Sequence, residues 1–418
     1  MITNKYLNGL KAGILLGILM LVSLCLTAQE IGKPFPHWQK GLMDIHHINT
    51  GKGECALFML PDGTTMLVDA GVHTRKMDEN AAKAVPDDSR QPGEWIARYI
   101  QKVLKPARIK KLDYVVLTHF DTDHIGGILP GLKTGKGGYF LTGVSEVLEY
   151  IPASKIIDRN WSDYNWPKPL TQDHIANYRR FVEWQVKNNN VQAEQFKVGS
   201  QQQISLLKEP GSYLAFQIRN LVANGVVWTG KGDETENHYP AVESLTSHFP
   251  SENGSSIGFR LTYGLFDYFT GGDLIGVPSK NSPAWHDIET PVARVTGPVD
   301  VHVLNHHGYV DAQNAFFLSV LQPRVSILQA WDSYHPAPDP LDRIMSEEIY
   351  EGPRDLFATN IIDTARQRLG DKVNKIASQQ GHIVVRVVDG GASYMVFVLD
   401  DTNEKQLVKA KFGPYMSK

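Results

Sequence analysis

Four side chains that can bind a metal ion follow directly after a hydrophobic run of the chain. The run, Leu112–Thr118, has five apolar residues in seven and predicts a buried strand. The side chains after it are His119, Asp121, Asp123 and His124, with Gly126 and Gly127 behind them. Alternate side chains of an extended segment share a face, so the first three can converge, and the turn into the glycines brings the fourth in from another angle. The cluster predicts a metal site with room for a pair of ions.

Other polar residues also stand at the ends of predicted strands. Asp69 ends MLVDAG, Asp273 ends FTGGDL, and His306 and His307 end VLNHHG. An Asp before Gly is usually a turn former, so none of these is informative by itself. Because they occupy comparable structural positions, together they favour a site built along one edge of two sheets.

The order of the predicted elements indicates the fold class. Short β-rich runs separated by turn residues fill 42–69 and predict antiparallel hairpins, whereas Pro92–Val103 predicts an amphipathic helix. Strand patterns return from Ser256 onward, and a Gly-Gly hairpin stands near 383–399. Between about 145 and 250 the pattern loosens into polar runs, which predicts an insertion that covers the metal face. We expect an α/β (α+β) fold with two sheets between helices, in one domain over 37–418.

The N-terminus predicts export. An apolar stretch of 17 residues at 12–28 follows Lys5 and Lys11 and ends in small residues before Gln29. This pattern is typical of a signal peptide, here about 1–28, so we expect a periplasmic or extracellular protein. The stretch is at the lower limit for a bilayer span, so an uncleaved anchor is the alternative and the one membrane contact expected. Lipidation at Cys25 is disfavoured because Leu24 precedes it.

Cysteine content and charge exclude several classes of site. After cleavage Cys55 has no partner, which excludes disulfides and Cys-ligated zinc, so any metal must use His, Asp and Glu. Lys+Arg total 42 and Asp+Glu 45, a formal charge of −3. The chain therefore lacks the basic surface that tight nucleic-acid binding requires. Nucleic acid remains a substrate class but not a tightly held ligand.

The pattern His119-x-Asp121-x-Asp123-His124 resembles the HxDxDH form of the metallo-β-lactamase signature. The opening MDIHHINTGKGECALFMLPDGTTMLVDAG and the later His306-His307-Gly308 are similar to the subgroup that includes the C-terminal domain of ComEC, the DNA-uptake protein. The resemblance extends with interruptions over about 42–336. It implies a four-layer αββα sandwich with a dinuclear metal centre. The chain departs from the ComEC-like pattern at Tyr309, where serine is common, and at Glu54, where aspartate is usual.

The resemblance also implies a role for each residue. His119 and Asp121 would bind one metal, Asp123 and His124 the other, and Asp273 would bridge the two. His306 or His307 would complete the second metal, and we prefer His306 because it comes first after the strand. Asp69 would be an internal support and not a ligand. His174, His238 and His248 are candidates for a third ligand of the first metal, but none has a matching motif, so this metal is expected to be the weaker.

The donor set and one further histidine indicate the chemistry. A carboxylate at position 121 is a harder donor than imidazole, so the two divalent ions are expected to be zinc or manganese, or iron. Two such ions can hold a hydroxide, which Asp123 would orient. His335, in Ser333-Tyr-His-Pro336, would bind a phosphate oxygen or protonate a leaving group.

We therefore expect a secreted, dinuclear-metal-dependent hydrolase of the phosphodiesterase or nuclease type, acting through a metal-bound hydroxide. The first alternative is hydrolysis of a lactam, lactone or thioester on the same centre. The second is a non-catalytic member of the fold that binds at the cell surface. The expected partner is a small-molecule or phosphodiester substrate, and the sequence leaves the oligomeric state open.

Overall fold

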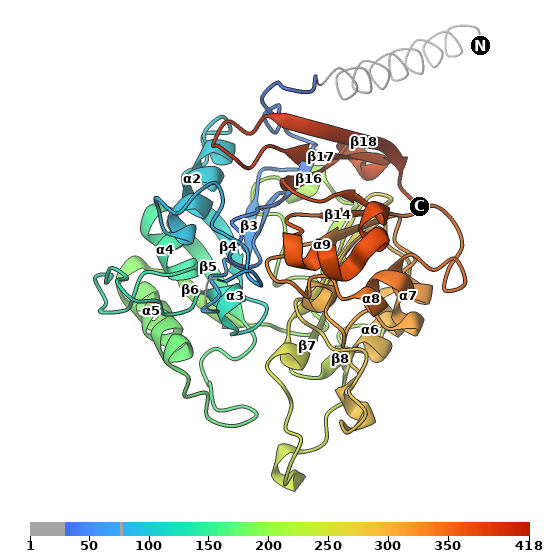
Figure 1. The fold of residues 1–418 in the computed structure, drawn as a ribbon. Helices are drawn as coiled ribbons and strands as arrows, with labels where there is room; N and C mark the ends of the chain where they lie inside the picture. The colour runs from blue at the N-terminus through green and yellow to red at the C-terminus, as the bar shows by residue number, and fades with distance from the viewer. Residues whose placement is uncertain (1–29, 76–77) are drawn as a thin grey trace, which may run out of the picture.

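The computed structural model describes residues 30–75 and 78–418 (Figure 1). The predicted signal peptide at about 1–28 lies outside the described residues. Within the described part, no helix combines the length and the apolar character needed to cross a bilayer.

The first of two large sheets has nine strands in the order β18-β17-β16-β1-β2-β3-β4-β5-β6. Strands β3 to β6 run parallel, and the other neighbours in this sheet are antiparallel. The strands are β1 (Met43–His47), β2 (Ala56–Met59), β3 (Thr65–Val68), β4 (Leu112–Val116), β5 (Ala153–Asp158), β6 (Gln192–Gln195), β16 (His382–Val387), β17 (Ser393–Leu399) and β18 (Val408–Met416).

The second sheet also has nine strands, in the order β15-β14-β13-β12-β11-β10-β7-β8-β9. Strands β11 to β15 run parallel, and β10, β7, β8 and β9 continue the sheet antiparallel. The strands are β7 (Phe216–Ala223), β8 (Val226–Trp228), β9 (Thr235–Asn237), β10 (Gly258–Tyr263), β11 (Phe266–Thr270), β12 (Val301–Val303), β13 (Val325–Leu328), β14 (Asp355–Ala358) and β15 (Ile376–Ser378).

The two sheets pack face to face, and helices cover their outer faces (Figure 1). Apolar side chains of both sheets form the central layer, for example Phe58 and Met66 of the first and Phe259 and Val301 of the second. The first sheet is covered by α2 (Pro92–Leu104), α4 (Val144–Tyr150) and α5 (Asp173–Asn189), and the second by α6 (Glu289–Thr296), α7 (Ala315–Leu321), α8 (Pro338–Ile344) and α9 (Asp363–Leu369). The expected αββα sandwich is confirmed.

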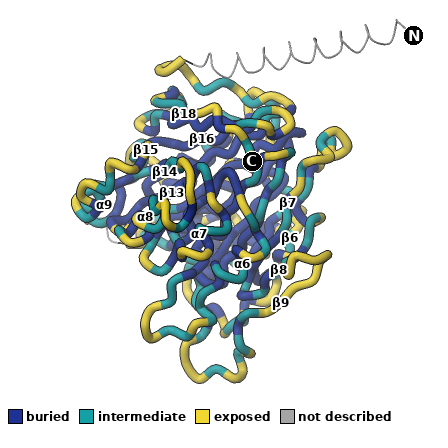
Figure 2. Tube along the Cα trace, turned by 90° about the vertical axis from the view of Figure 1, so that its right-hand side faces the viewer, coloured by how far each residue is buried: buried dark blue, intermediate teal, exposed yellow. Residues whose placement is uncertain are grey.

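Residues 145–250 belong to the sandwich and are not inserted into it. They supply most of α4, all of α5, and strands β5 to β9, which extend both sheets. The sequence pattern predicted an insertion because the outermost of these strands are exposed and therefore polar. β9 is exposed along its whole length, and β6 is half-buried to exposed. Figure 2 shows the same contrast between the buried inner strands and the exposed end of the second sheet near β9. That residues 145–250 cover the metal face stays a prediction.

Parallel strands bring the predicted ligands to one edge of the sandwich. Asp69 follows β3 and His119 follows β4, its parallel neighbour; Asp273 follows β11, and His306 follows the parallel β12. The carboxyl ends of parallel strands meet at one edge of a sheet, where α/β proteins commonly place their sites. Both sheets therefore contribute to a single site.

Two buried histidines of the strands make stability depend on pH. Burial lowers the pKa of His46 and of His302 to about 4 each. The unfolded chain takes up these protons near pH 6.5, whereas the folded chain resists until about pH 4. Each neutral ring therefore costs stability as the pH falls through this window.

We expect His302→Gln to reduce the loss of unfolding free energy between about pH 7 and pH 5 by roughly 1–2 kcal/mol. Glutamine removes the titration but keeps a donor for Gln313 Oε1, which lies 2.9 Å from His302 Nε2. Urea unfolding in the presence of EDTA measures the slope of the unfolding free energy against pH without competition from metal. His37→Gln, at an exposed histidine, should leave the slope as in the parent. An equal slope in both variants would show that His302 does not carry the effect.

Candidate metal centre

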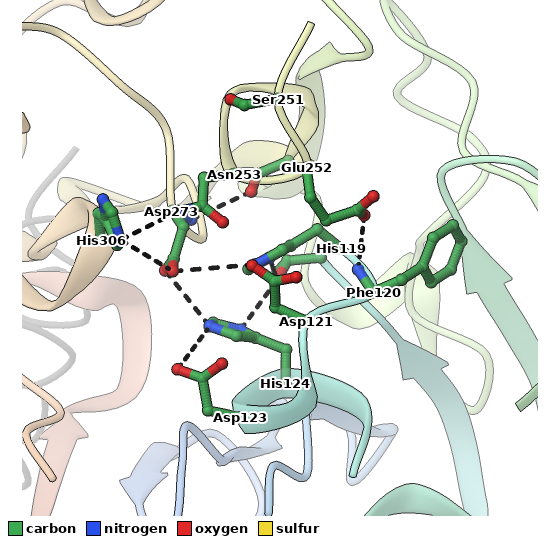
Figure 3. Close-up of polar contacts among 12 residues, drawn as sticks. His119, Phe120, Asp121, Asp123, His124, Ser251, Glu252, Asn253, Asp273 and His306 are labelled. Atoms are coloured by element: carbon green, nitrogen blue, oxygen red, sulfur yellow. Dashed lines mark hydrogen bonds and ion pairs between the residues drawn. The ribbon is translucent and has the colours of Figure 1, made fainter. Parts of the chain in front are cut away.

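His119 and Asp121 lie on the segment between β4 and α3 (Thr122–Ile125) and face Asp273 of the other sheet (Figure 3). His119 Nε2 is 3.6 Å from Asp121 Oδ2 and 3.8 Å from Asp273 Oδ2. His119 is fully buried, yet its Nε2 makes no hydrogen bond within the described residues. Asp121 is 44% exposed and opens this group to solvent.

A second group forms around Asp123, His124 and His307. His307 Nε2 lies 3.0 Å from Asp123 Oδ2 and 3.4 Å from His124 Nε2. Asp273 joins this group too, since its Oδ1 is 3.3 Å from His124 Nε2. Ligand atoms bound tetrahedrally to a zinc ion stand roughly 3.4 Å apart. The spacing in both groups therefore suits a metal ion, and the bare Nε2 of His119 is the kind of buried donor that an ion would satisfy.

The predicted ligand His306 lies beside this second group and not within it. Its Nε2 is 3.8 Å from Asp273 Oδ2 and 3.0 Å from Asn253 Nδ2. His306 and His307 both have positive φ, 46° and 49°, in the turn Asn305–Gly308 after β12. The left-handed turn sends the second histidine back between Asp123 and His124, and coming first after the strand gives His306 no advantage. The structure therefore corrects our preference for His306 in the second group.

Three hydrogen bonds fix which ring nitrogen faces the centre. His124 Nδ1 lies 2.8 Å from Asp69 Oδ2, and His307 Nδ1 lies 2.8 Å from the Gln329 carbonyl oxygen. His306 Nδ1 lies 2.6 Å from Asp311 Oδ1. Because each Nδ1 donates its proton to its partner, Nε2 is the ring nitrogen that faces Asp273 and that can bind a cation once its own proton is released, which is the arrangement of metal-binding histidines. Asp69 thus supports His124 from behind, as the family resemblance implied.

Asp69 itself is locked in place by the strand beside it. Its carboxylate accepts from the Thr118 backbone N–H at 2.8 Å and from the Thr118 hydroxyl at 2.7 Å. The next turn passes so close to Asp123 that a Cβ at Gly71 would lie 1.6 Å from the Asp123 carbonyl oxygen. The glycine of MLVDAG is therefore required by this contact.

Charges in the centre are balanced by protons that a cation can replace. Burial opposes the charged form of His124, but Asp273 and Asp123 outweigh it, so the pKa of His124 is raised well above its usual value. The same opposition between burial and Asp273 raises the pKa of His307 to about 9. The pKa of Asp123 is lowered, because His124 and His307 outweigh its burial. Such a set binds a divalent cation by releasing the histidine protons.

The predicted catalytic residue His335 lies against the second group. Its ring stacks on His307 with centroids 4.6 Å apart and an interplanar angle of 21°. Burial, followed by the charge of His307, lowers its pKa well below the usual value, so the ring is neutral. His335 is therefore a neutral hydrogen-bonding group beside the centre.

Three residues of the centre were not predicted from the sequence. Trp331 Nε1 donates to Asp123 Oδ2 at 3.0 Å, and His73 stacks on the Trp331 indole at 4.2 Å. Glu54 is buried beside His307, with Oε2 3.7 Å from Nδ1, and burial raises its pKa to about 7. The sequence offered a signal for two of them: His73 comes four residues after Asp69, and Glu54 lies in the Gly-Lys-Gly-Glu turn. Nothing in the sequence indicated that Trp331 belongs to the centre.

The turn around Glu252 holds the segment of His119 and the ring of His306 from outside the centre (Figure 3). Glu252 Oε1 accepts from the Phe120 backbone N–H at 2.8 Å, which pins the segment that carries His119. The buried Arg159 in turn holds Glu252 through bonds of 2.9 and 2.6 Å. Asn253, the next residue, contacts His306.

The three other histidine candidates are elsewhere in the described structure. His174 lies in the first turn of α5 on the outer layer, and His238 follows the edge strand β9. His248 contacts His286 through its carbonyl oxygen. No contact between described residues joins any of the three to Asp273.

We expect Trp331→Phe to lower metal affinity by about 10- to 100-fold, because it keeps a ring but removes the donor that orients Asp123. Competition with a fluorescent zinc chelator measures the affinity. Trp95→Phe is the matched control, since Trp95, on α2, also donates a hydrogen bond from Nε1, here to the Asp87 carbonyl oxygen. Equal affinities in the two variants would remove Trp331 from the centre.

Residues 51–138 match the profile of the metallo-β-lactamase superfamily. No curated protein matches the chain. Similar solved structures include a CmlA β-hydroxylase (12% identity, TM-score 0.37, 85% of this chain and 55% of that chain), a diphosphatase of the PhnP family (10%, 0.33, 82% and 97%) and human short-form tRNase Z (9%, 0.30, 68% and 92%). This chain thus spans little more than half of the hydroxylase. The matched segment contains Asp69 and the cluster from His119 to His124, so this part of the chain is similar to the metallo-β-lactamase superfamily.

Proposed function

We propose that this chain is an exported, dinuclear-metal-dependent phosphodiesterase. The observation that carries the proposal is the position of the Asp273 carboxylate between two groups of donors. Its Oδ1 is 3.3 Å from His124 Nε2, and its Oδ2 is 3.8 Å from both His119 Nε2 and His306 Nε2. A carboxylate so placed is a natural bridge between two ions.

The two adjacent histidines divide between the ions. His307, with Asp123 and His124, holds the second ion, as the 3.0 and 3.4 Å separations support. His306, with His119 and Asp121, would hold the first ion. It would thus be the third ligand of this ion, a role for which the sequence had offered His174, His238 and His248. The Asp311 carboxylate behind His306 supports this role, because it leaves Nε2 as the free donor. Zinc, manganese or iron fits such a set of imidazole and carboxylate donors.

Two bound divalent ions supply Lewis acidity and lower the pKa of a water molecule that they bind. Around them, Asp123 is held by Trp331 and can orient the water, while the neutral His335 can donate a hydrogen bond to the leaving oxygen. Asp121 and the partly exposed His306 mark the side open to a substrate.

The phosphodiester preference rests on the resemblance to ComEC-like domains and on nearby cations. Arg75, half exposed, pairs with Asp332 next to Trp331, and Arg368 donates to the Ser333 carbonyl oxygen. Two guanidinium groups on the approach to the centre favour an anionic substrate. Export rests on the apolar stretch at 12–28.

Metal content tests the ligand division. We expect Asp273→Ala to lose most of both ions, because a bridge serves two, whereas His306→Ala and His307→Ala each lose about one. Metal analysis after gel filtration gives the stoichiometry, and cobalt substitution gives a separate spectrum for each remaining site. His37→Ala is the control. Full metal content in Asp273→Ala would disprove the dinuclear centre, and an unchanged His306→Ala would remove that residue from it.

Turnover tests the reaction. The zinc- or manganese-loaded protein should hydrolyse bis(p-nitrophenyl) phosphate faster than a chromogenic lactone or β-lactam. His335→Ala should lower kcat by about 100-fold, because it removes a donor to the leaving oxygen. Circular dichroism confirms that the variant is folded. Preference for the lactone or the lactam would reassign the chain to the acyl-transfer alternative.

A further inference from the structure

Two tyrosines, Tyr309 and Tyr334, stand at the open side of the centre and have no part in the reaction proposed above. Tyr309 follows His306-His307-Gly308, and its ring centroid is 5.1 Å from that of His306. Tyr334 precedes His335, whose ring stacks on His307. The two tyrosine rings contact each other edge to face, 5.9 Å apart at 68°. This tyrosine pair therefore spans the space between the backbone segment that carries His306 and His307 and the segment that carries His335.

The pair is accessible, unlike most aromatic residues of the described chain. Tyr334 is 40% exposed, Tyr309 is half-buried, and the adjacent Val310 is 47% exposed. One exposed aromatic side chain on a protein surface needs no explanation. Apolar surface that continues directly from a group of metal-binding side chains is different, because it lies where a bound substrate must lie.

Arg368 backs Tyr334 on one face. Its guanidinium lies 3.3 Å from the ring centroid and donates to the Ser333 carbonyl oxygen at 2.9 Å. These two contacts hold the Tyr334 ring in place, so little conformational freedom is lost when another ring packs on the exposed part of this ring. Arg368 also adds positive charge beside this face, which suits an aromatic group attached to an anion.

We infer that the tyrosine pair is a subsite for an aromatic ring of the substrate, such as an aryl group or a nucleobase attached to the phosphodiester. The inference rests on the proposed function for the phosphodiester part alone. The ring packs on Tyr334 and against the edge of Tyr309, while the anionic ester faces the centre beside His306. Serine at position 309, as in ComEC-like domains, would remove one wall of this subsite.

The experiment compares ligands with and without a ring. Phenylphosphonate and methylphosphonate carry the same anion, are not hydrolysed, and bind the metal-loaded protein in calorimetry. We expect the parent protein to bind phenylphosphonate more tightly by about 3- to 10-fold. Tyr334→Ala should abolish this difference and raise KM for bis(p-nitrophenyl) phosphate by about the same factor, with kcat changed less than about 2-fold.

Two variants control for structure. Tyr334→Phe keeps the ring and should bind as the parent does. Tyr150→Ala removes a tyrosine of similar exposure, 42%, at the end of the outer helix α4, and should have no effect. Tyr309→Ala gives a second probe of the same subsite and should halve the preference or more.

The outcomes separate the subsite from the reaction. Turnover of the diester with equal binding of the two phosphonates in the parent would overturn the subsite and leave the hydrolase standing. Equal weakening of both phosphonates by Tyr334→Ala would also overturn it, since the effect would then not concern the ring. A Tyr334-dependent preference for phenylphosphonate without turnover would support the subsite and reject the phosphodiesterase.

Discussion

The centre depends on the carboxylate of Asp273, which comes from one sheet and contacts side chains of the other. Asp273 follows β11 of the second sheet, yet its oxygens lie within 3.8 Å of His119 and His124, which follow β4 of the first. Carboxylates packed this closely with Asp123 in a buried site repel one another, and the repulsion must be offset by positive charge. The histidine protons do so in the protein alone, and divalent cations do so better because each carries two charges and is bound by several donors. At this edge, the two sheets can therefore pack together only when positive charge, from histidine protons or from divalent cations, lies between the carboxylates.

The surroundings of the centre limit how far its side chains can move. Asp69, Asp311 and the Gln329 carbonyl oxygen each hold the outer nitrogen of one histidine, and Trp331 holds Asp123. These partners come from both sheets and from loops far apart in sequence, so a small shift between the sheets would misplace several donors at once. The backbone supports the same geometry with positive φ at Asp69, His306 and His307. Such conformations are costly and persist where the surrounding structure fixes them, as at functional sites.

The sequence predicted the parts of the molecule that depend on local pattern. The buried run Leu112–Thr118 with its polar ending, the strand-end Asp69 and Asp273, and the sandwich all follow from short-range signals of burial and turn formation. The choice between His306 and His307 did not follow from such signals. It depends on two consecutive residues with positive φ, and histidine residues do not indicate this backbone conformation in a sequence. Strands β5 to β9 were also not predicted as parts of the sheets. The edge strands among them, β6 and β9, lack a fully buried face, so their sequences resemble those of loops. Trp331 is part of the centre only through a tertiary contact 208 positions away in sequence.

The two ion positions differ in exposure as well as in donors. Asp123, His124 and His307 are 9%, 0% and 2% exposed, so the second position is closed on the side of the protein. The first position includes the side chains of Asp121, 44% exposed, and His306, 16% exposed. Water screens and competes for an open site more than for a closed one, so we expect an ion at the first of the two proposed positions to be held less firmly. The sequence argument predicted the same order from the hardness of Asp121 and a missing histidine, and this order stays a prediction. Exposure gives it a more direct physical reason, because the position that we expect to be open to substrate is also the position open to solvent. A substrate that approaches there meets His306 and the tyrosine pair first, so binding of its aromatic part and access to the more exchangeable ion occur on the same side of the molecule.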